Sequence, residues 1–312
     1  MQWLSNFEGE LELAFTKAEN ILAKLPVTFN RPALAYLDKF HVLKDGRSKN
    51  YICYLLPYWL GEHVEVHMTD SQNFAVANIF GMMYYHLIDE MMDEPNAKST
   101  QQLPLANLIH LEFIQIYNGY FPAESPFWYY FKKYITEWAE AVTHEQHQDY
   151  FQEKSNAIAH KAAPVKLSIV SSILLTGEED KDLITQLEDA VDTVLVTLQM
   201  VDDWQDWKKD LQEGSYNCLI SMVQSQLHIP KDRRPTHAEI EQALYSTDLL
   251  LRYAERAESN HETLEAIKPI VPYLYQFHGY LCDNVKQAAR QIEAERQLLQ
   301  QGGLAYWLSK NI

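Results

Sequence analysis

The segment DEMMDE, at the end of a long apolar stretch, is the first feature with chemical potential. Asp89 and Asp93 are four residues apart, and Glu90 stands between them. At about 100° per residue, this spacing places Asp89 and Asp93 on one face of a helix, one turn apart. A single divalent cation could bridge them. We therefore predict that Asp89, Glu90 and Asp93 bind metal.

A second acidic segment, DDWQDWKKD, repeats the spacing over two turns at Asp202, Asp206 and Asp210. Like charges at this spacing destabilise an isolated helix by roughly a few tenths of a kcal/mol per pair, and partial burial adds to this cost. Bound cations would relieve the repulsion. Because the ligands are hard oxygens with no accompanying cysteine, the segment favours Mg²⁺ over zinc.

Each segment alone is equally well interpreted as a solvated acidic helix end, because short acidic runs are common. Their combination favours a shared site. Both follow a long apolar stretch, and the second carries Lys208 and Lys209 where a bound phosphate would need positive charge.

Helices are the elements that must position these residues. Glycine is scarce, at 10 residues, whereas Leu, Ala, Glu, Gln and Lys abound. Residues 74–92 are apolar on nearly every face, which indicates a helix at the centre of a bundle. From 183 to 201, apolar residues recur at three- and four-residue steps, which indicates one amphipathic helix. We predict an all-α fold.

The helices are expected to form one domain over residues 1–312, because no low-complexity linker, composition shift or fixed repeat divides the chain. Prolines are expected to mark the loops between helices. They stand near positions 26 and 32, at 95, 122 and 126, at 230 and 235, and at 269 and 272.

Composition limits the partners and the compartment. The formal net charge of -17 disfavours nucleic acid and anionic lipid as partners. Because 47% of the residues are hydrophobic, the chain can bury a large core. Cys53, Cys218 and Cys282 lie far apart, so their spacing predicts neither a zinc site nor a disulfide framework. No basic leader and no apolar run of about 18 residues is found, so we expect a cytoplasmic protein without a membrane span.

Three fragments resemble one enzyme superfamily. DEMMDE resembles the first aspartate-rich motif, DDxxD, of trans-prenyltransferases and class I terpene synthases. From Gln199, QMVDDWQDWKKD is similar to the prenyltransferase pattern Q-x-x-D-D-x-x-D, and from Asp202 it fits a variant of the terpene synthase pattern N/D-D-x-x-S/T-x-x-K-E. HKAAPVKL is similar to a prenyltransferase helix whose diphosphate-binding lysine corresponds to Lys161, with His160 and Lys166 as lesser candidates.

This resemblance to class I isoprenoid synthases covers residues 46–210 and implies a single-domain helical bundle with a central active-site cavity. It implies three Mg²⁺ ions and a prenyl diphosphate substrate, with a homodimer as a family-level expectation. The implied metal ligands are Asp89, Glu90, Asp93, Asp202, Asp206 and Asp210, of which Asp89, Asp93, Asp202 and Asp206 are assigned as catalytic. The implied diphosphate-binding residues are Lys161, Lys209, Gln199 and Arg47, and the hydrocarbon pocket would use Phe80, Tyr84 and Tyr85.

Within the superfamily, the residues favour cyclisation over chain elongation. Elongating enzymes bind isopentenyl diphosphate through a G-K-x-R-P-like motif, which the segment DGRSKNY matches poorly. Their histidine before the first motif is replaced by Met82, and their arginine pair after it by Lys98 and Ser99. Losing these donors removes charged hydrogen bonds worth roughly a few kcal/mol. We therefore expect a terpene synthase acting on a farnesyl or geranylgeranyl diphosphate, with a trans-prenyltransferase as the alternative.

Two further interpretations remain open. A helical bundle with inward carboxylates can hold two iron ions, and His86 stands close to Asp89, Glu90 and Asp93. Such proteins usually need paired Glu-x-x-His motifs, which the sequence lacks. An inactive scaffold that keeps only the bundle is the other alternative.

Overall fold

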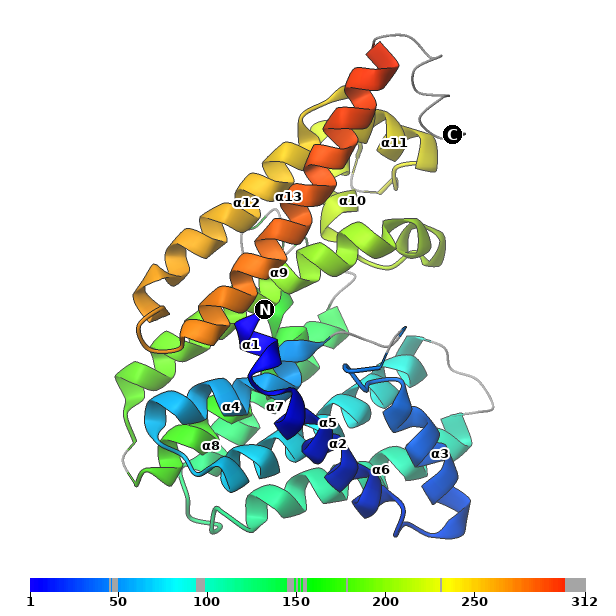
Figure 1. The fold of residues 1–312 in the computed structure, drawn as a ribbon. Helices are drawn as coiled ribbons and strands as arrows, with labels where there is room; N and C mark the ends of the chain where they lie inside the picture. Colours follow the sequence, from blue (N-terminus) through cyan, green and yellow to red (C-terminus); the bar gives the residue numbers. More distant parts are fainter. Residues whose placement is uncertain are drawn as a thin grey trace. The chain divides into compact units, whose positions relative to one another are not determined.

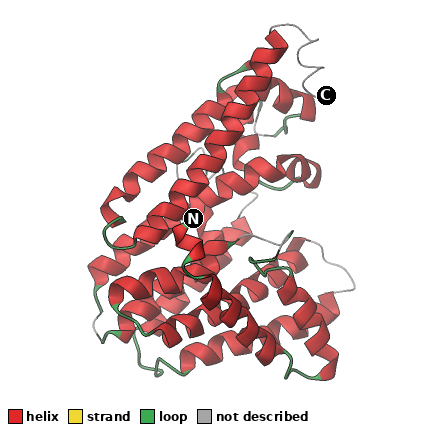
Figure 2. Ribbon diagram, viewed as in Figure 1, coloured by secondary structure: helices red, strands yellow, loops and turns green. Residues whose placement is uncertain are grey.

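The apolar stretches of the sequence are helical in the computed structural model of the chain (Figures 1 and 2). The structure describes residues 1–44, 46, 50–93, 99–144, 149, 151, 153, 156–177, 179–230 and 232–300, with the backbone alone at 93, 99–101 and 299. These residues form thirteen α-helices and two 3-10 segments, with no strand among them. The all-α prediction is therefore confirmed for the described chain.

The chain divides into two units, which are described separately. The first unit comprises Met1–Trp138, Ala162–Asp189 and Pro269–Leu274, and the second takes the remaining segments. The boundary falls inside the long helix α9 (Lys181–Glu213), so this helix contributes residues to both units. The expectation of one domain over residues 1–312 stays a prediction.

The first unit is built around helix α5 (Met68–Asp93), which packs against α2, α4 and α6. Phe74, Ile79 and Phe80 on α5 are fully buried, so the prediction of a helix at the centre of a bundle is confirmed. The other helices of this unit are α1 (Gln2–Ser5), α2 (Glu8–Leu22), α3 (Val27–Asp38), α4 (Tyr51–Val64), α6 (Ser99–Asn118), most of α7 (Phe127–His144) and α8 (Leu167–Leu175).

A buried asparagine connects three helices of this unit. The Asn78 side-chain amide donates to the carbonyl of Cys53 at 2.7 Å and to the hydroxyl of Ser168 at 2.8 Å. These contacts join α5 to α4 and α8. Because the site is buried, each bond also satisfies a polar group that could not reach water.

The second unit contains the acidic half of α9 and the helices that follow it. These are α10 (Cys218–Gln226), α11 (His237–Ser246), α12 (Leu249–Thr263), η2 (Leu264–Ile267) and nearly all of α13 (Pro272–Gln300). The buried Tyr253 hydroxyl of α12 donates to the carbonyl of Met200 on α9 at 2.9 Å. Helices α12 and α13 run side by side in Figure 1, joined by an ion pair between Lys286 and Glu258.

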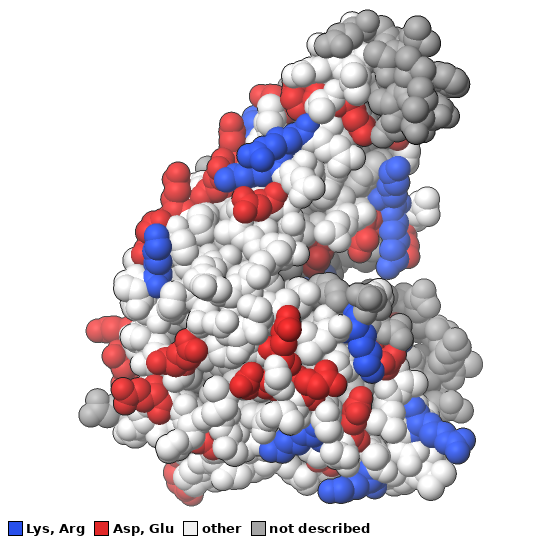
Figure 3. All heavy atoms as spheres, viewed as in Figure 1, with Lys and Arg blue, Asp and Glu red and all other residues white. Residues whose placement is uncertain are grey.

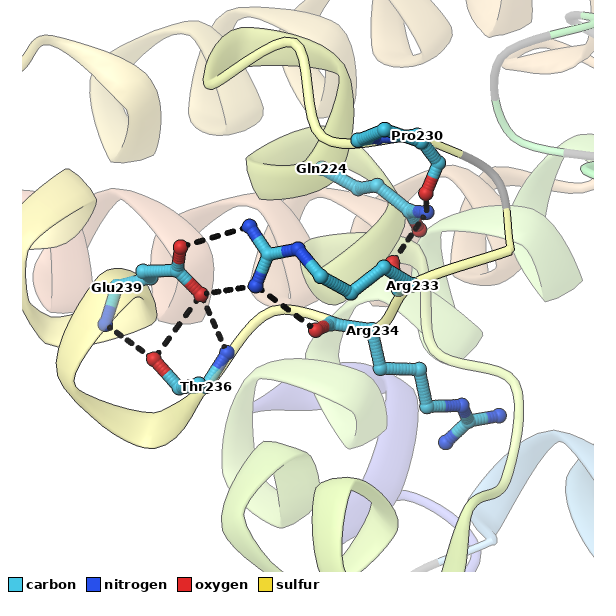
Figure 4. A network of polar contacts seen from close by, with 6 residues as sticks. All are labelled: Gln224, Pro230, Arg233, Arg234, Thr236 and Glu239. Atoms are coloured by element: carbon cyan, nitrogen blue, oxygen red, sulfur yellow. Dashed lines mark hydrogen bonds and ion pairs between the residues drawn. The ribbon is translucent and has the colours of Figure 1, made fainter.

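The connection from α10 to α11 is held by the polar network of Figure 4. Gln224 donates to the carbonyls of Pro230 and Arg233, at 2.9 and 3.0 Å. The Arg233 guanidinium forms two hydrogen bonds with the Glu239 carboxylate, at 2.9 and 2.8 Å. Thr236 and Glu239 form a capping box at the start of α11, which satisfies backbone donors that the first turn leaves free.

Most of the named prolines lie between helices or at a helix start, as predicted, and Pro95 lies outside the described residues. Pro230 lies in the connection just described, and Pro272 begins α13. The prediction is wrong at Pro32, which lies inside α3. A helix can accommodate an internal proline when the surrounding packing compensates for the lost hydrogen bond.

One stretch of the described chain, Asn156–Leu175, is long and apolar enough to cross a membrane, by length and composition only. Lys161 and Lys166 interrupt its apolar residues, so it contains no uninterrupted apolar run of about 18 residues. The protein buries 72% of it. The stretch joins the 3-10 segment η1 (Asn156–Lys166) to α8, and the backbone leaves helical geometry at Ala162. Burial and this kink are typical of a core segment and make the stretch weak evidence for a membrane span.

Candidate functional site

The two acidic segments lie in different units of the chain. DEMMDE ends α5 in the first unit, and DDWQDWKKD lies on the part of α9 that belongs to the second. Each is therefore described in its own surroundings. The expectation that the two segments share one site stays a prediction.

The aspartates of α9 differ sharply in their exposure. Asp202 and Asp206, one helical turn apart, are both exposed, and Asp210 is half-buried. Asp203, rotated by about 100° from Asp202, is only 2% exposed. The helix therefore presents the predicted metal ligands outward and turns the adjacent aspartate into the protein.

Asp203 attaches α9 to the start of α10. One carboxylate oxygen accepts from the side-chain amide of Gln199 at 2.6 Å, and the other accepts from the backbone N–H of Cys218 at 2.5 Å. The Asp203 carbonyl accepts from the side chain of Asn217 at 2.8 Å. Burial raises the pKa of the Asp203 carboxyl to about 6, although the hydrogen bonds from Cys218 and Gln199 oppose the shift.

Asn217 caps helix α10 and also contacts the acidic face. Its side-chain oxygen accepts from the backbone N–H groups of Leu219 and Ile220, at 2.9 and 3.1 Å. Its amide nitrogen donates to the Asp210 carboxylate at 2.7 Å. Burial raises the pKa of Asp210, and the bond from Asn217 opposes that shift. The cap therefore orients Asp210 while it begins the next helix.

The Asp202 carboxyl is electrostatically unfavourable when ionised. Crowding by surrounding protein atoms raises its pKa to about 7, and the negative charges of Asp203 and Asp206 add to the shift. The side chain nevertheless remains open to solvent. A carboxylate that is accessible yet destabilised by its neighbours is suited to bind a cation, which would replace repulsion with attraction.

We expect the stability of the metal-free protein to report this repulsion. A carboxyl with a raised pKa binds its proton more tightly in the folded state, so its contribution to stability is lost as pH rises from its ordinary value of 3.8 to about 7. Asp202→Asn removes the charge and keeps the shape. In chelator, the free energy of unfolding of this variant should therefore exceed that of the wild type by more at pH 8 than at pH 5. A difference between the two proteins that does not change with pH would contradict the assignment.

The predicted phosphate-binding lysines have different surroundings. Lys166 is 2% exposed, and its ammonium lies 2.8 Å from a Glu137 carboxylate oxygen. Lys161 is half-buried and Lys209 is exposed, the latter 3.8 Å from Glu213. Because Lys166 is buried, the partly accessible Lys161 is the better phosphate-binding candidate of the HKAAPVKL segment. On the face drawn in Figure 3, basic and acidic side chains are interspersed among the described residues.

The first acidic segment is contacted by helix α3. Glu90 lies 3.6 Å from the ammonium of Lys39 and 3.8 Å from the ring of His86. The Tyr36 side chain is buried. Burial raises the pKa of Tyr36, and the charge of Glu90, a hydrogen bond to the Glu90 carboxylate and the charge of Asp89 add to the shift.

The three aromatic residues predicted for a hydrocarbon pocket lie about one to two and a half turns before Asp89. Phe80 is fully buried and Tyr85 is 9% exposed. The Tyr85 ring lies 4.7 Å from that of Trp138, and Tyr84 stacks on His110 at 4.1 Å, measured between ring centroids. These contacts form an aromatic core between α5, α6 and α7.

Some predicted residues cannot be placed. Arg47 and Lys98 lie outside the described residues, as does the side chain of Asp93. Gln199 is placed, and its amide nitrogen is directed to Asp203. Met82, which replaces the elongation histidine, is half-buried on α5.

Two residues that organise the acidic face have no role predicted from spacing. Asp203 is part of the acidic motif, and Asn217 lies outside it. An asparagine just before the apolar run CLISMV is a readable helix start signal. Its contact with Asp210 was not readable, because it depends on how α10 turns back along α9.

The carboxylates fit magnesium by their chemistry, since hard oxygens that leave room for water suit this ion. In the described part of the chain, the one group of three or more candidate ligands with atoms within 4.8 Å of one another is His261, His278 and Cys282. The aspartates whose side chains the structure describes thus do not form such a group. Open sites of one or two carboxylates, completed by water and phosphate, are typical of Mg²⁺.

Comparisons with protein-family models, with curated proteins and with solved structures find no match for this chain.

Proposed function

We propose that this protein is a class I terpene synthase that ionises an allylic prenyl diphosphate of the farnesyl or geranylgeranyl class and cyclises or rearranges the resulting carbocation. The division of aspartates on α9 supports the proposal most directly. Asp202 and Asp206 are exposed one turn apart, whereas Asp203 is buried and fixes the local backbone. A solvated acidic helix end would not require such sorting.

Bound Mg²⁺ would supply Lewis-acid stabilisation of the departing diphosphate. On the second unit, Asp202, Asp206 and Asp210 would hold it, with Asn217 orienting Asp210. On the first unit, Asp89, Glu90 and Asp93 would do so. Lys161 and Lys209 would bind diphosphate oxygens by charged hydrogen bonds.

The aromatic core would serve the hydrocarbon part of the substrate. Tyr84 and Tyr85 precede Asp89 by one turn or slightly more, so they lie next to the proposed diphosphate end. Aromatic faces stabilise carbocations by cation–π attraction and exclude the water that would otherwise capture them. The raised pKa of both tyrosines, caused by burial, keeps their hydroxyls neutral.

The deciding experiment is an assay of the purified protein with Mg²⁺ and geranyl, farnesyl or geranylgeranyl diphosphate, each with and without isopentenyl diphosphate. Mass spectrometry of organic extracts should show a hydrocarbon or terpene alcohol without isopentenyl diphosphate. Longer prenyl diphosphates formed only in its presence would instead identify a trans-prenyltransferase. No product from any substrate, with no binding of Mg²⁺ or inorganic diphosphate, would favour an inactive scaffold. Bound iron with an optical band would favour the di-iron alternative.

A further inference from the structure

A cluster of three side chains, separate from both acidic segments, lies between α12 and α13. The Nδ1 atoms of His261 and His278 are 2.9 Å apart, and the Cys282 sulfur lies 3.4 Å from Nδ1 of His278. All three potential ligand atoms lie within 4.8 Å of one another. His278 and Cys282 share one face of α13, four residues apart, and His261 reaches them from α12.

The hydrogen bonds around Thr197 assign the tautomer of His278. The Thr197 hydroxyl accepts from the side-chain amide of Asn260 at 3.0 Å and donates to the carbonyl of Thr193 at 3.4 Å. Because the hydroxyl proton is directed to Thr193, we assign the proton of His278 to Nε2, which lies 2.8 Å from the Thr197 oxygen. The other ring nitrogen, Nδ1, then carries a lone pair that faces Nδ1 of His261.

We propose that His261, His278 and Cys282 form a binding site for a divalent transition-metal ion, and that this ion is zinc. Two imidazole nitrogens and a thiolate are the ligands that zinc prefers, and magnesium disfavours them. In a tetrahedral zinc site, with zinc–nitrogen and zinc–sulfur bonds of about 2.0 and 2.3 Å, ligand atoms lie roughly 3.3 to 3.6 Å apart. The observed separations of 2.9 and 3.4 Å are close to these values. The two imidazole rings are nearly parallel, 3° apart, with centroids 5.1 Å apart, so they must rotate before both Nδ1 lone pairs converge on one ion.

The surroundings of the cluster supply two further properties of a metal site. The Thr197 hydroxyl, itself bonded by Asn260, holds the ring of His278 at Nε2, as groups behind metal-binding histidines commonly do. His278 and Cys282 are buried, whereas His261 is partly exposed. The exposed side gives the ion a route of entry and leaves a fourth position for water.

Binding also requires local proton movements. Without metal, the Cys282 sulfur donates to the Ala257 carbonyl at 3.1 Å, and burial raises the pKa of this thiol to about 12. Ligation by Cys282 therefore displaces one proton into solvent. His261 stays neutral, with its proton moving from Nδ1 to Nε2. Cysteine spacing alone does not predict this site, because two of the three ligands are histidines and one of them comes from another helix.

The site predicts that chelator-treated full-length protein binds about one Zn²⁺ or Co²⁺ per chain. Bound Co²⁺ should give visible d–d bands and an ultraviolet thiolate charge-transfer band, both displaced by Zn²⁺. His261→Ala, at a partly exposed position, should weaken binding by at least about tenfold. Cys282→Ser should abolish the charge-transfer band, and circular dichroism will show whether it keeps its fold. Cys53→Ala, which removes a buried cysteine of the first unit, should leave both signals unchanged.

Absence of saturable Co²⁺ or Zn²⁺ binding would overturn the proposal, as would unchanged affinity in His261→Ala. A charge-transfer band lost in Cys53→Ala and kept in Cys282→Ser would also overturn it. The readouts are independent of terpene synthase activity. Failure of the enzymatic assay therefore leaves this site standing, and failure of this test leaves the proposed function standing.

Discussion

Replacing Asp202 by alanine is expected to lower kcat by roughly 10²-fold or more with each active prenyl diphosphate, because the change removes a ligand to the ions that would stabilise the leaving group. The fold should not lose stability, since the side chain is exposed on α9 and its charge is repelled by Asp203 and Asp206. Steady-state kinetics at several Mg²⁺ concentrations, together with thermal unfolding, measure both quantities. The Mg²⁺ concentration needed for half-maximal activity should also rise.

A matched control is available on the same helix. Asp182 is an exposed aspartate in the first turn of α9, far along the helix from the acidic motif. Asp182→Ala should retain the wild-type kcat. Asp89→Ala should reproduce the loss seen in Asp202→Ala if the first unit shares the metal-binding role. Wild-type turnover by Asp202→Ala would rule out the assignment of this residue as a metal ligand.

The neighbouring substitution Asp203→Ala should instead cause a large loss of stability. The carboxylate is buried and accepts hydrogen bonds from Gln199 and from the backbone N–H of Cys218. Truncation leaves both donors without their partner. Each buried unsatisfied group costs about 1 to 3 kcal/mol, so the free energy of unfolding should fall by about 2 to 6 kcal/mol. Urea denaturation followed by circular dichroism measures the change.

Asp203→Asn distinguishes lost hydrogen bonds from lost charge. Its carbonyl oxygen can accept from Cys218, and its amide can donate to Gln199 after rotation of the glutamine side chain. This variant should therefore lose much less stability than Asp203→Ala. If the two variants are equally unstable, the negative charge at Asp203 matters more than its hydrogen-bond geometry. If neither is destabilised, Asp203 does not anchor α10.

The positions of the helices could be predicted from the sequence more fully than the local roles of their residues. The apolar stretch 74–92 predicted a buried helix, and α5 is one. The three- and four-residue periodicity from 183 to 201 predicted one amphipathic helix, and α9 continues through Asp210. Periodicity succeeds here because the helical repeat places every third or fourth residue on the same face whatever the rest of the chain does.

Spacing also assigned Asp202 and Asp206 to one face of a helix, since that relation depends only on helical geometry. The role of Asp203 depends on where α10 begins, and the difference between Lys161 and Lys166 depends on the position of Glu137 on α7. His261 joins His278 and Cys282 only because α12 and α13 pack together. The sequence by itself thus determined the helical class and the acidic faces. The tertiary structure alone decided which polar groups are buried, paired or brought together, because those properties arise from contacts between residues distant in the chain.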